Sequence, residues 1–330
     1  MILASAPGRA GIIGNPTDMY GGSVISCSIA ERAYCRLGDA EEMVCRIDSD
    51  VLVVTGKEML ALDGGRFDLM KAAIYALGID PATTRPFSLE VWTEIPEQAG
   101  LAGSTALLAA IMRCLIEHFE MRLTPYQIAE TVRRVEWDVM KITCGYQDHY
   151  MAVFGGLNYM DFRGKEMMRQ DDDEPYASIE CLSRFHQDLP MILAHTGVKR
   201  FSGGVHKSIR DRWLEGDREV IDAYNRIAHL GRLGKKALLA CDWKRLAELM
   251  NENHAIQRDL GGSGDANERL IQAALDSGAM GAKLAGAGRG GTIIAIGEDL
   301  ERLEAGLMEA GAEKLLRLKP SEGLIVERMC

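Results

Sequence analysis

Residues 96–106 form a loop of small residues that leaves a predicted strand and enters a predicted helix directly; their sequence is Pro-Glu-Gln-Ala-Gly-Leu-Ala-Gly-Ser-Thr-Ala. Residues 87–95 alternate apolar and polar side chains, as a half-buried strand does. Residues 104–119 repeat apolar side chains with the period of an amphipathic helix. Because backbone N–H groups and the macrodipole at a helix N-terminus favour negative charge, this order predicts a phosphate-binding loop.

The loop matches neither of two common nucleotide-binding signatures. No Gly-Lys-Ser or Gly-Lys-Thr follows its glycines, which excludes a Walker A loop. The glycine spacing of a dinucleotide fingerprint is also absent. The sequence therefore predicts a phosphate site of another type.

Length, charge and cysteine usage narrow the fold class and the partners. A chain of 330 residues is long for one hydrophobic core, which predicts two domains. The net charge of −10 argues against a broad surface for polyanions, so we expect no nucleic-acid partner. The eight cysteines form no Cys-x-x-Cys pair, which favours a reducing cytoplasm. We expect neither a signal peptide nor a membrane partner, because no long uninterrupted apolar window is present.

The predicted elements mix strands and helices. We expect a strand over 2–6, a glycine-rich turn over 7–22 and a strand over 23–29, followed by short strands of a mostly antiparallel sheet to about residue 55. The acidic run 171–174 is expected to be a solvated hairpin loop. Helices are expected over 67–77, 104–119, 125–141, 148–154, 204–215, 217–230, 243–258, 266–276 and 300–310. Further strands are expected over 157–162, 189–195, 292–296 and 323–328.

Three glycine-dense segments, 8–22, 98–103 and 278–291, lie far apart in the chain. Any one of them alone could serve only tight turns, helix caps and strand crossings. Together and in this order they resemble the three motifs of the GHMP kinases, the superfamily of galactokinase, homoserine kinase, mevalonate kinase and phosphomevalonate kinase. The resemblance implies an α+β, two-domain fold. Residues 1–185 would form a ribosomal protein S5 domain 2-like unit with the ATP and substrate motifs, and 186–330 a ferredoxin-like unit.

The resemblance also implies two catalytic residues and a magnesium site. Arg9 matches an arginine that lies beside the reacting hydroxyl, and Asp148 matches an aspartate that approaches the acceptor hydroxyl. Glu136, twelve residues before Asp148, matches a glutamate that binds Mg²⁺, and Ser104 matches a serine that contacts Mg²⁺ and phosphate. Asp148 and Ser104 could instead cap their helices, and Asp18 could instead form an Asx turn. Mg²⁺ takes few ligands from protein carboxylates, so one glutamate, one serine and ATP would suffice.

The remaining candidate residues fall in the same motifs. The nucleotide-binding candidates are Gln98, Ala99, Gly100, Leu101, Ala102, Gly103, Ser104, Thr105, Gly286, Ala287 and Gly288. The substrate-binding candidates are Asn15, Asp18, Tyr20, Lys199 and Arg210. The implied co-substrate is ATP, and the implied cofactor is Mg²⁺.

Four segments, 15–18, 95–104, 145–161 and 205–217, resemble the glucuronokinase branch, and 205–217 matters most because it lies outside the shared motifs. That branch phosphorylates the anomeric hydroxyl of glucuronate, whose carboxylate needs a cation; Lys199, Arg200 and Arg210 are candidates, although each could be a solvated surface residue. Asn15-Pro16 stands where galactokinases have Glu-His, which disfavours galactose. We expect a cytoplasmic, monomeric or homodimeric enzyme that transfers the γ-phosphoryl group of ATP to a sugar hydroxyl. The alternatives are a heptose, galactose or mevalonate kinase, or a non-catalytic sugar and ATP sensor.

Overall fold

Two β-sheets organise the chain. The computed structural model describes residues 1–165, 175–185, 188–198, 208–286, 288 and 290–329. Among these, the first sheet has the strand order β12-β1-β2-β5-β3-β4, with β6 paired to β2 and β7 paired to β6. Its strands are β1 (Ile2–Ile13), β2 (Ser23–Asp39), β3 (Val44–Ile47), β4 (Asp50–Val53), β5 (Phe87–Thr93), β6 (Leu157–Asp161), β7 (Ser178–Cys181) and β12 (Ile325–Arg328).

The pairing in the first sheet is mostly antiparallel, as predicted; β3 and β5 form a parallel pair. The second sheet has the antiparallel order β11-β8-β10-β9. Its strands are β8 (Met191–His195), β9 (Gly281–Leu284), β10 (Thr292–Ile296) and β11 (Lys314–Arg317). The predicted α+β class is therefore confirmed.

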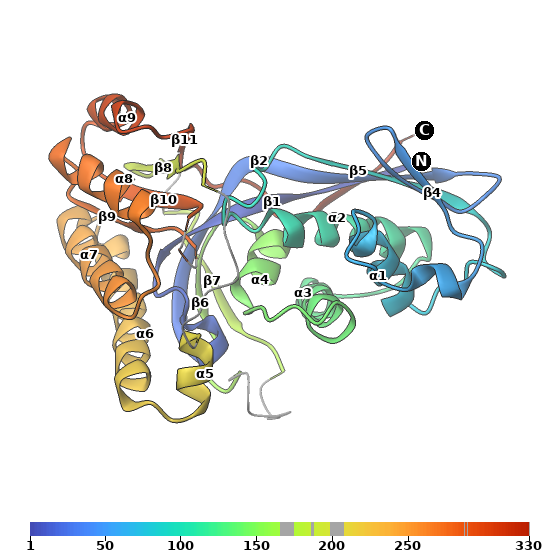
Figure 1. Ribbon diagram of the computed structural model, residues 1–330, viewed down its shortest axis with the longest axis horizontal. Helices are drawn as coiled ribbons and strands as arrows, with labels where there is room; N and C mark the ends of the chain where they lie inside the picture. Colours follow the sequence, from blue (N-terminus) through green and yellow to red (C-terminus); the bar gives the residue numbers. More distant parts are fainter. Residues whose placement is uncertain (166–174, 186–187, 199–207, 287, 289, 330) are drawn as a thin grey trace.

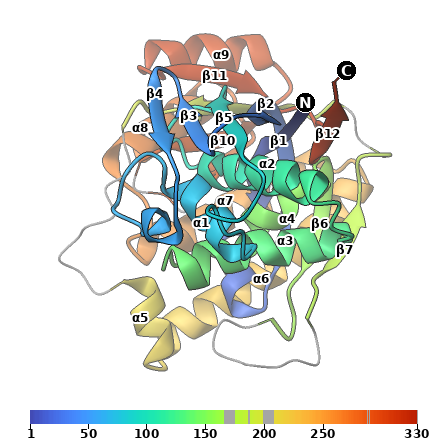
Figure 2. The same ribbon diagram turned by 90° about the vertical axis from the view of Figure 1, so that its right-hand side faces the viewer.

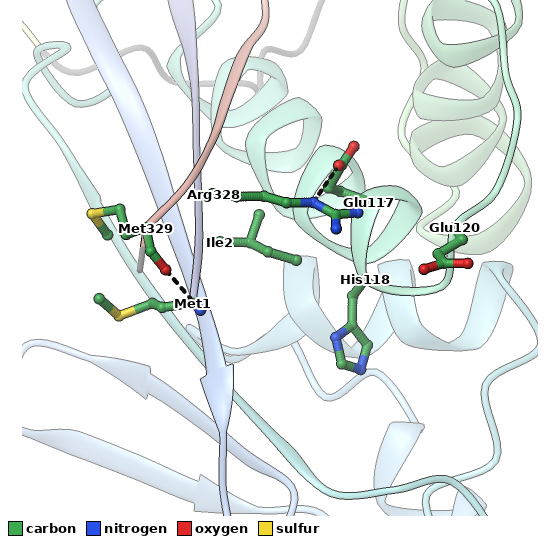
Figure 3. Close-up of a pocket in the computed structure, with 7 residues that line it drawn as sticks. All are labelled: Met1, Ile2, Glu117, His118, Glu120, Arg328 and Met329. Carbon is green, nitrogen blue, oxygen red and sulfur yellow. Dashed lines mark hydrogen bonds and ion pairs between the residues drawn. The ribbon is translucent and has the colours of Figure 1, made fainter.

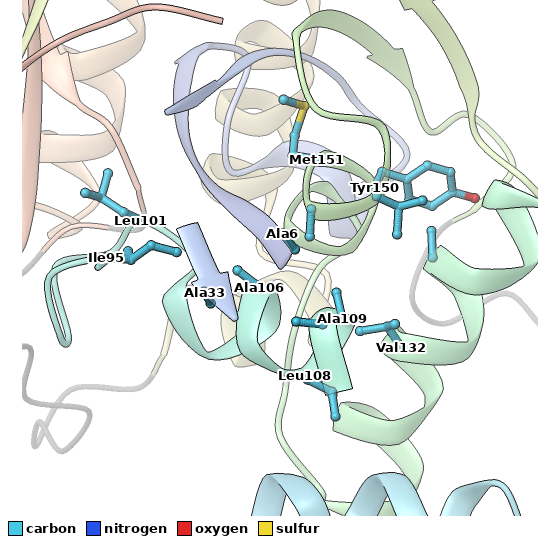
Figure 4. Close-up of a cluster of buried hydrophobic side chains, with 14 of the residues drawn as sticks. Ala6, Ala33, Ile95, Leu101, Ala106, Leu108, Ala109, Val132, Tyr150 and Met151 are labelled. Carbon is cyan, nitrogen blue, oxygen red and sulfur yellow. The ribbon is translucent and has the colours of Figure 1, made fainter. Parts of the chain in front are cut away.

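Four helices lie on one face of the first sheet (Figure 1). They are α1 (Asp68–Ala76), α2 (Gly103–His118), α3 (Pro125–Arg134) and α4 (Gln147–Phe154). Helix α2 packs directly on β1 and β2, and α3 and α4 pack against it. Figure 4 shows the small side chains Ala6, Ala33, Ala106 and Ala109 at this contact. Because alanine side chains are small and these four are fully buried, the backbone of α2 packs close to the two strands. This packing fixes the position of the N-terminus of α2.

The second sheet is covered by the helices of the C-terminal half, which group beside it in Figures 1 and 2. Of these, α7 (Trp243–Asp259), α8 (Asp265–Asp276) and α9 (Leu300–Glu309) contact its strands. Helix α6 (Arg218–Leu239) packs on α7, and a short α5 (Ile209–Leu214) precedes it. Helix α7 packs on β9, and α6 also reaches β2 of the first sheet. Strand β12 returns from this half and pairs with β1. The chain ends on the sheet where it begins.

The predicted glycine-rich turn over 7–22 is wrong in its first half, because β1 continues to Ile13. The glycines inside β1 serve close packing against other backbone. A Cβ on Gly8 would lie 2.8 Å from the carbonyl oxygen of Leu101, and one on Gly11 would lie 3.0 Å from that of Ala285. Glycine within a strand here marks a close backbone approach, which the sequence pattern alone does not distinguish from a turn.

The predicted helix over 217–230 is too short, because α6 continues through Gly231 and Gly234 to Leu239. These glycines lie against the first sheet. A Cβ on Gly231 would lie 2.2 Å from the carbonyl oxygen of Ser23, and one on Gly234 would lie 2.7 Å from Cγ2 of Ile13. The lost helix propensity of glycine is thus offset by a contact between the two halves of the molecule.

The start of α3 confirms a sequence prediction, and its end departs from one. Thr124 Oγ1 accepts a hydrogen bond from Gln127 N at 3.3 Å, and Gln127 Oε1 accepts one from Thr124 N at 2.8 Å, which is a capping box. The predicted helix over 125–141 changes at residue 135 into a π-helical turn, η3 (Val135–Val139). Such turns are frequent at functional sites, and η3 carries Glu136.

Within the described residues, no helix is both long and apolar enough to cross a membrane.

Candidate active site

The three glycine-dense segments meet at the middle of β1. Arg9 N donates to the carbonyl oxygen of Leu101 at 3.0 Å, and Gly11 N donates to that of Ala285 at 2.8 Å. Thr292 Oγ1 donates to the carbonyl oxygen of Ala99 at 2.9 Å. Strand β1 therefore joins the loop before α2 to the loop between β9 and β10, and it brings together segments almost 200 residues apart in the chain.

The loop before α2 has an unusual backbone. Gln98, Gly100 and Ala102 have φ values of 54°, 73° and 60°, so every second residue is left-handed. Left-handed residues alternating in this way turn successive N–H groups toward one side and create a concavity for anions. Helix α2 follows at Gly103, and no side chain among the described residues caps its first turn. The concavity and the free N-terminus provide adjacent donors for a phosphate group.

Arg9 connects this loop with Asp148 in the first turn of α4. Its Nε and Nη2 atoms both lie 2.7 Å from Oδ1 of Asp148, and its Nη1 donates to the carbonyl oxygen of Gly100 at 2.8 Å. The Arg9 side chain is 9% exposed, whereas that of Asp148 is 33% exposed. Asp148 is thus held at one oxygen and remains open to solvent. The alternative role as a helix cap is not observed, because the cap position is Tyr146.

Asp18 holds the N-terminus of α4 in place. Its Oδ2 accepts hydrogen bonds from the backbone N–H groups of Tyr146 at 2.7 Å and Gln147 at 2.9 Å. Burial raises the pKa of Asp18, the two N–H groups oppose this, and the nearby Asp148 carboxylate adds to it. Gly145 is required here, because a Cβ would lie 1.9 Å from Oδ2 of Asp18. Asp18 therefore helps to fix the position of Asp148.

Glu136 is bound on both sides of its carboxylate. Its Oε1 accepts a hydrogen bond from Thr105 Oγ1 at 2.8 Å, and its Oε2 lies 2.9 Å from Nε2 of His149. Burial lowers the pKa of His149, but the Glu136 carboxylate and the nearby Cys144 side chain together outweigh it and raise this pKa to about 10. At neutral pH, His149 and Glu136 therefore form a buried ion pair. His149 was not among the predicted site residues, although it follows Asp148 directly.

The structure brings Glu136 to Thr105 of α2, while the Ser104 side chain is exposed at the same helix start. Thr105 and Glu136 offer a hydroxyl and a carboxylate oxygen, the hard ligands that Mg²⁺ prefers, beside the N–H groups at which a phosphate would bind. The donor set therefore fits a magnesium ion that also contacts phosphate. Thr105 lies three and four residues before the buried Leu108 and Ala109, so it belongs to the buried face of the helix. The apolar period of the sequence therefore contained a signal that Thr105 faces inward.

A buried lysine links the first and third glycine segments. Lys283 Nζ donates to Oδ1 of Asn15 at 2.8 Å, and Asn15 Nδ2 lies 3.4 Å from the carbonyl oxygen of Gly286. Asn253 of α7 donates to the carbonyl oxygen of Asn15 and accepts from Gly14 N. Lys283 is fully buried, and sequence reasoning gave it no role. Asn15 is therefore held between both halves of the molecule.

Lys283 makes the stability of the fold depend on pH. Burial, together with the nearby Arg9 charge, lowers its pKa from 10.5 to about 7. Between pH 10.5 and about pH 7 the unfolded chain binds more protons than the folded chain, so the free energy of unfolding decreases as the pH is lowered through this range. The stability that neutral, buried Lys283 contributes is therefore complete at high pH and is lost once the pH falls through about 7. One pKa unit corresponds to roughly 1.4 kcal/mol.

We expect the free energy of unfolding of the wild type, from urea denaturation, to rise relative to that of Lys283→Met between about pH 7 and pH 9; parallel profiles would contradict this.

A second group of predicted residues gathers around η1 (Thr17–Tyr20) and α5. Tyr20 contacts Trp213 and Tyr224 edge to face, with ring centroids 4.9 Å and 4.7 Å apart. Burial and the Asp18 carboxylate raise the pKa of Tyr20 to about 12, and Arg210 opposes them. Nε of Arg210 is buried and has no hydrogen-bond partner among the described residues, and its Nη1 lies 3.8 Å from Oδ1 of the adjacent Asp211. Arg210 is thus a cation near Tyr20 that has one buried N–H group without a partner among the described residues.

The other predicted residues divide into two sets. Gly286 and Gly288 pack against backbone, since a Cβ on either would lie within 2.7 Å of a carbonyl oxygen. Lys199, Arg200, Ala287, the acidic run 171–174 and most of the predicted helix start at 204–208 lie outside the described residues. The structure therefore brings together Arg9, Asp148 and the loop before α2, and it places Asn15 beside Gly286.

Figure 3 shows a pocket of about 290 Å³ at the opposite end of α2. It is lined by Met1, Ile2, Glu117, His118, Glu120, Arg328 and Met329. Its cations already have partners: Arg328 Nε lies 2.9 Å from Oε1 of Glu117, and the N-terminal amine donates to the carbonyl oxygen of Met329. This pocket is therefore a weaker candidate for a phosphorylated ligand than the loop before α2.

Three protein-family models match parts of the chain. They describe the N-terminal domain of GHMP kinases at residues 68–156, the C-terminal domain of GHMP kinases at residues 235–311, and a galactose-binding signature of galactokinase at residues 2–38. The first range spans α1 to α4, and the second spans the end of α6 through α9. The first range includes the loop before α2, Glu136 and Asp148.

Known proteins are similar over most of the chain. Glucuronokinase 1 of Arabidopsis thaliana is 30% identical over 302 residues, which cover 85% of this chain and 81% of the relative. The D-glycero-alpha-D-manno-heptose 7-phosphate kinase of Campylobacter jejuni is 27% identical, with 88% and 87% covered. The crystal structure of Lactococcus lactis galactokinase with galactose superposes with a TM-score of 0.78 at 18% identity, covering 98% of this chain and 95% of that one. The expected two-domain fold is thereby confirmed.

Proposed function

We propose that this chain, which belongs to the GHMP kinases and is thus a phosphotransferase acting on a sugar or alcohol, phosphorylates the anomeric hydroxyl of a sugar acid such as glucuronate. The Arg9 guanidinium carries the proposal, because it bonds both Asp148 and the carbonyl oxygen of Gly100 in the phosphate-binding loop. A phosphate on that loop and a hydroxyl beside Asp148 would therefore be neighbours. Phosphoryl transfer requires this proximity.

In the proposed reaction, the phosphates of ATP bind the N–H groups of residues 98–105. The acceptor hydroxyl oxygen forms a bond to the γ-phosphorus, the bond from that phosphorus to the bridging oxygen breaks, and ADP leaves. Asp148 orients the hydroxyl and accepts its proton, and Arg9 stabilises the negative charge that develops. Glu136, with Thr105 or Ser104, would hold Mg²⁺, which neutralises phosphate charge.

The sugar-acid substrate is proposed from Arg210 and its aromatic neighbours. A carboxylate is recognised best by the two-pronged guanidinium of arginine, and the buried Nε of Arg210 has no hydrogen-bond partner among the described residues. Tyr20 and Trp213 offer ring surfaces for the apolar face of a sugar. The glucuronokinase and the heptose phosphate kinase named above act on sugars that carry an anionic group, which supports a cation in this position.

The seven described cysteines are free thiols, which suits the reducing cytoplasm that we propose as the location of the protein.

A substrate panel tests the proposal. We expect ADP release, followed by a coupled assay, to be fastest with glucuronate, in a panel that also contains galacturonate, galactose, a heptose 7-phosphate and mevalonate. Faster release with galactose or the heptose phosphate would keep the kinase and reject the sugar acid. Binding of sugar and ATP without ADP release from any of the five would favour the sensor instead.

A further inference from the structure

Three side chains with metal-binding atoms meet beside α2, on residues that the proposed phosphoryl transfer uses only in part. Glu136 comes from η3, Cys144 from the segment before α4, and His149 from α4 itself. One ligand atom of each, a carboxylate oxygen, a thiol sulfur and a ring nitrogen, lies within 4.8 Å of the others. Glu136 and His149 are buried, and Cys144 is half-buried. Two of the three ligand residues are thus shielded from solvent, and Cys144 is partly accessible to it.

His149 shows that this cluster has unused binding capacity. Its side chain is fully buried, and Nε2 faces Oε2 of Glu136 at 2.9 Å. Its other nitrogen, Nδ1, is buried and has no hydrogen bond to any described residue. A buried polar atom without a partner costs on the order of 1–3 kcal/mol. A ligand that used this nitrogen would remove that cost.

The three ligand types together favour one class of metal. Mg²⁺ prefers oxygen alone, whereas Zn²⁺ binds thiolate, imidazole and carboxylate in one tetrahedral set. Three protein ligands leave a fourth position open for water or a phosphate oxygen. We propose that Glu136, Cys144 and His149 form a binding site for Zn²⁺ that is distinct in chemistry from the magnesium site. On binding, the Cys144 thiol and the His149 imidazolium each release a proton to solvent, and their sulfur and nitrogen lone pairs bond the metal.

The position of the site gives it a consequence for activity. Zinc would occupy the Glu136 carboxylate, which the proposed function assigns to Mg²⁺, and it would bind the residue next to Asp148. Zinc is therefore expected to inhibit phosphoryl transfer. This consequence alone rests on the proposed function; binding of zinc does not.

Binding is measured without substrates, on the full chain freed of metal. In competition with a chromophoric zinc indicator, we expect the wild type to bind one equivalent of Zn²⁺ tightly and Cys144→Ala to bind none at the same affinity. Cys181→Ala, which removes an exposed thiol outside the cluster, is the matched control and keeps the site. With Co²⁺ in place of zinc, the wild type and the control should show a thiolate-to-cobalt absorption band that Cys144→Ala lacks. Equal zinc binding by wild type and Cys144→Ala, or no cobalt band in the wild type, would overturn the proposal.

Two further measurements separate a lost site from a lost fold. In the wild type, zinc should protect Cys144 from alkylation by iodoacetamide, as read by peptide mass mapping, and unchanged alkylation would refute thiol coordination. Cys144→Ala should keep the basal kinase activity and lose inhibition by zinc. If no substrate of the panel is turned over, the proposed function fails, while the indicator titration still decides whether the zinc site exists.

Discussion

Replacement of Asp148 by asparagine is expected to lower turnover by at least about a hundredfold, the lower range for loss of a general base. Asparagine has nearly the same shape, but its amide neither accepts the hydroxyl proton nor forms an ion pair with Arg9. The affinity for ATP should change little, because the loop before α2 and the start of that helix are untouched. Steady-state kinetics under saturating substrates, with ATP binding by calorimetry, measure both quantities.

A neighbouring carboxylate provides the control for Asp148→Asn. Asp138 is exposed on η3, ten residues before Asp148, and the same change there removes an equal charge away from Arg9. We expect Asp138→Asn to keep the turnover of the wild type. Turnover near that of the wild type in Asp148→Asn would refute the assigned role of this carboxylate.

Arg210→Gln is expected to reduce kcat/KM for glucuronate roughly 10- to 100-fold, because a hydrogen bond between charged groups contributes about 1.5–3 kcal/mol. The KM for ATP should not change, since Arg210 lies near Tyr20 and has no hydrogen bond or ion pair with the loop before α2 among the described residues. The measurement is a set of initial rates at varied glucuronate and then at varied ATP.

The matched control for Arg210 lies on the same short helix. Arg212 already has two partners, Asp217 Oδ2 at 2.7 Å and Glu219 Oε2 at 2.5 Å. Arg212→Gln should therefore leave kcat/KM for glucuronate near that of the wild type. An unchanged kcat/KM in Arg210→Gln, or an equal loss in Arg212→Gln, would show that Arg210 does not bind the carboxylate.

The elements that the sequence predicted well are those with strong local signals. Helix α2 follows the apolar period after residue 104, and α3 begins at Pro125, after Thr124, which forms a capping box with Gln127. Local pattern was misleading where glycine served long-range packing. Gly8 and Gly11 continue β1, and Gly231 and Gly234 continue α6, because each lies against backbone or side chains from a distant segment. A single sequence does not record which distant segment that is.

The candidate site shows the same division. Arg9 and Asp148 are 139 residues apart, and only the resemblance to the GHMP kinases predicted that both lie beside the acceptor hydroxyl; their 2.7 Å contact depends on the fold. Ser104 and Glu136 were expected to share Mg²⁺, and the structure adds a direct contact between Glu136 and Thr105, since the rotation of α2 decides which hydroxyl faces inward. The burial of Lys283 depends on packing between the two halves, so its pKa shift had no sequence signal.

The nature of the product tests the central claim most directly. Glucuronate, ATP and Mg²⁺ are incubated with the enzyme, and the phosphorus and proton NMR spectra of the product are recorded. We expect one new phosphate monoester whose phosphorus couples to the anomeric proton, with one ADP formed per ester. A phosphate ester at another carbon, ADP with inorganic phosphate alone, or no turnover of glucuronate would contradict the claim.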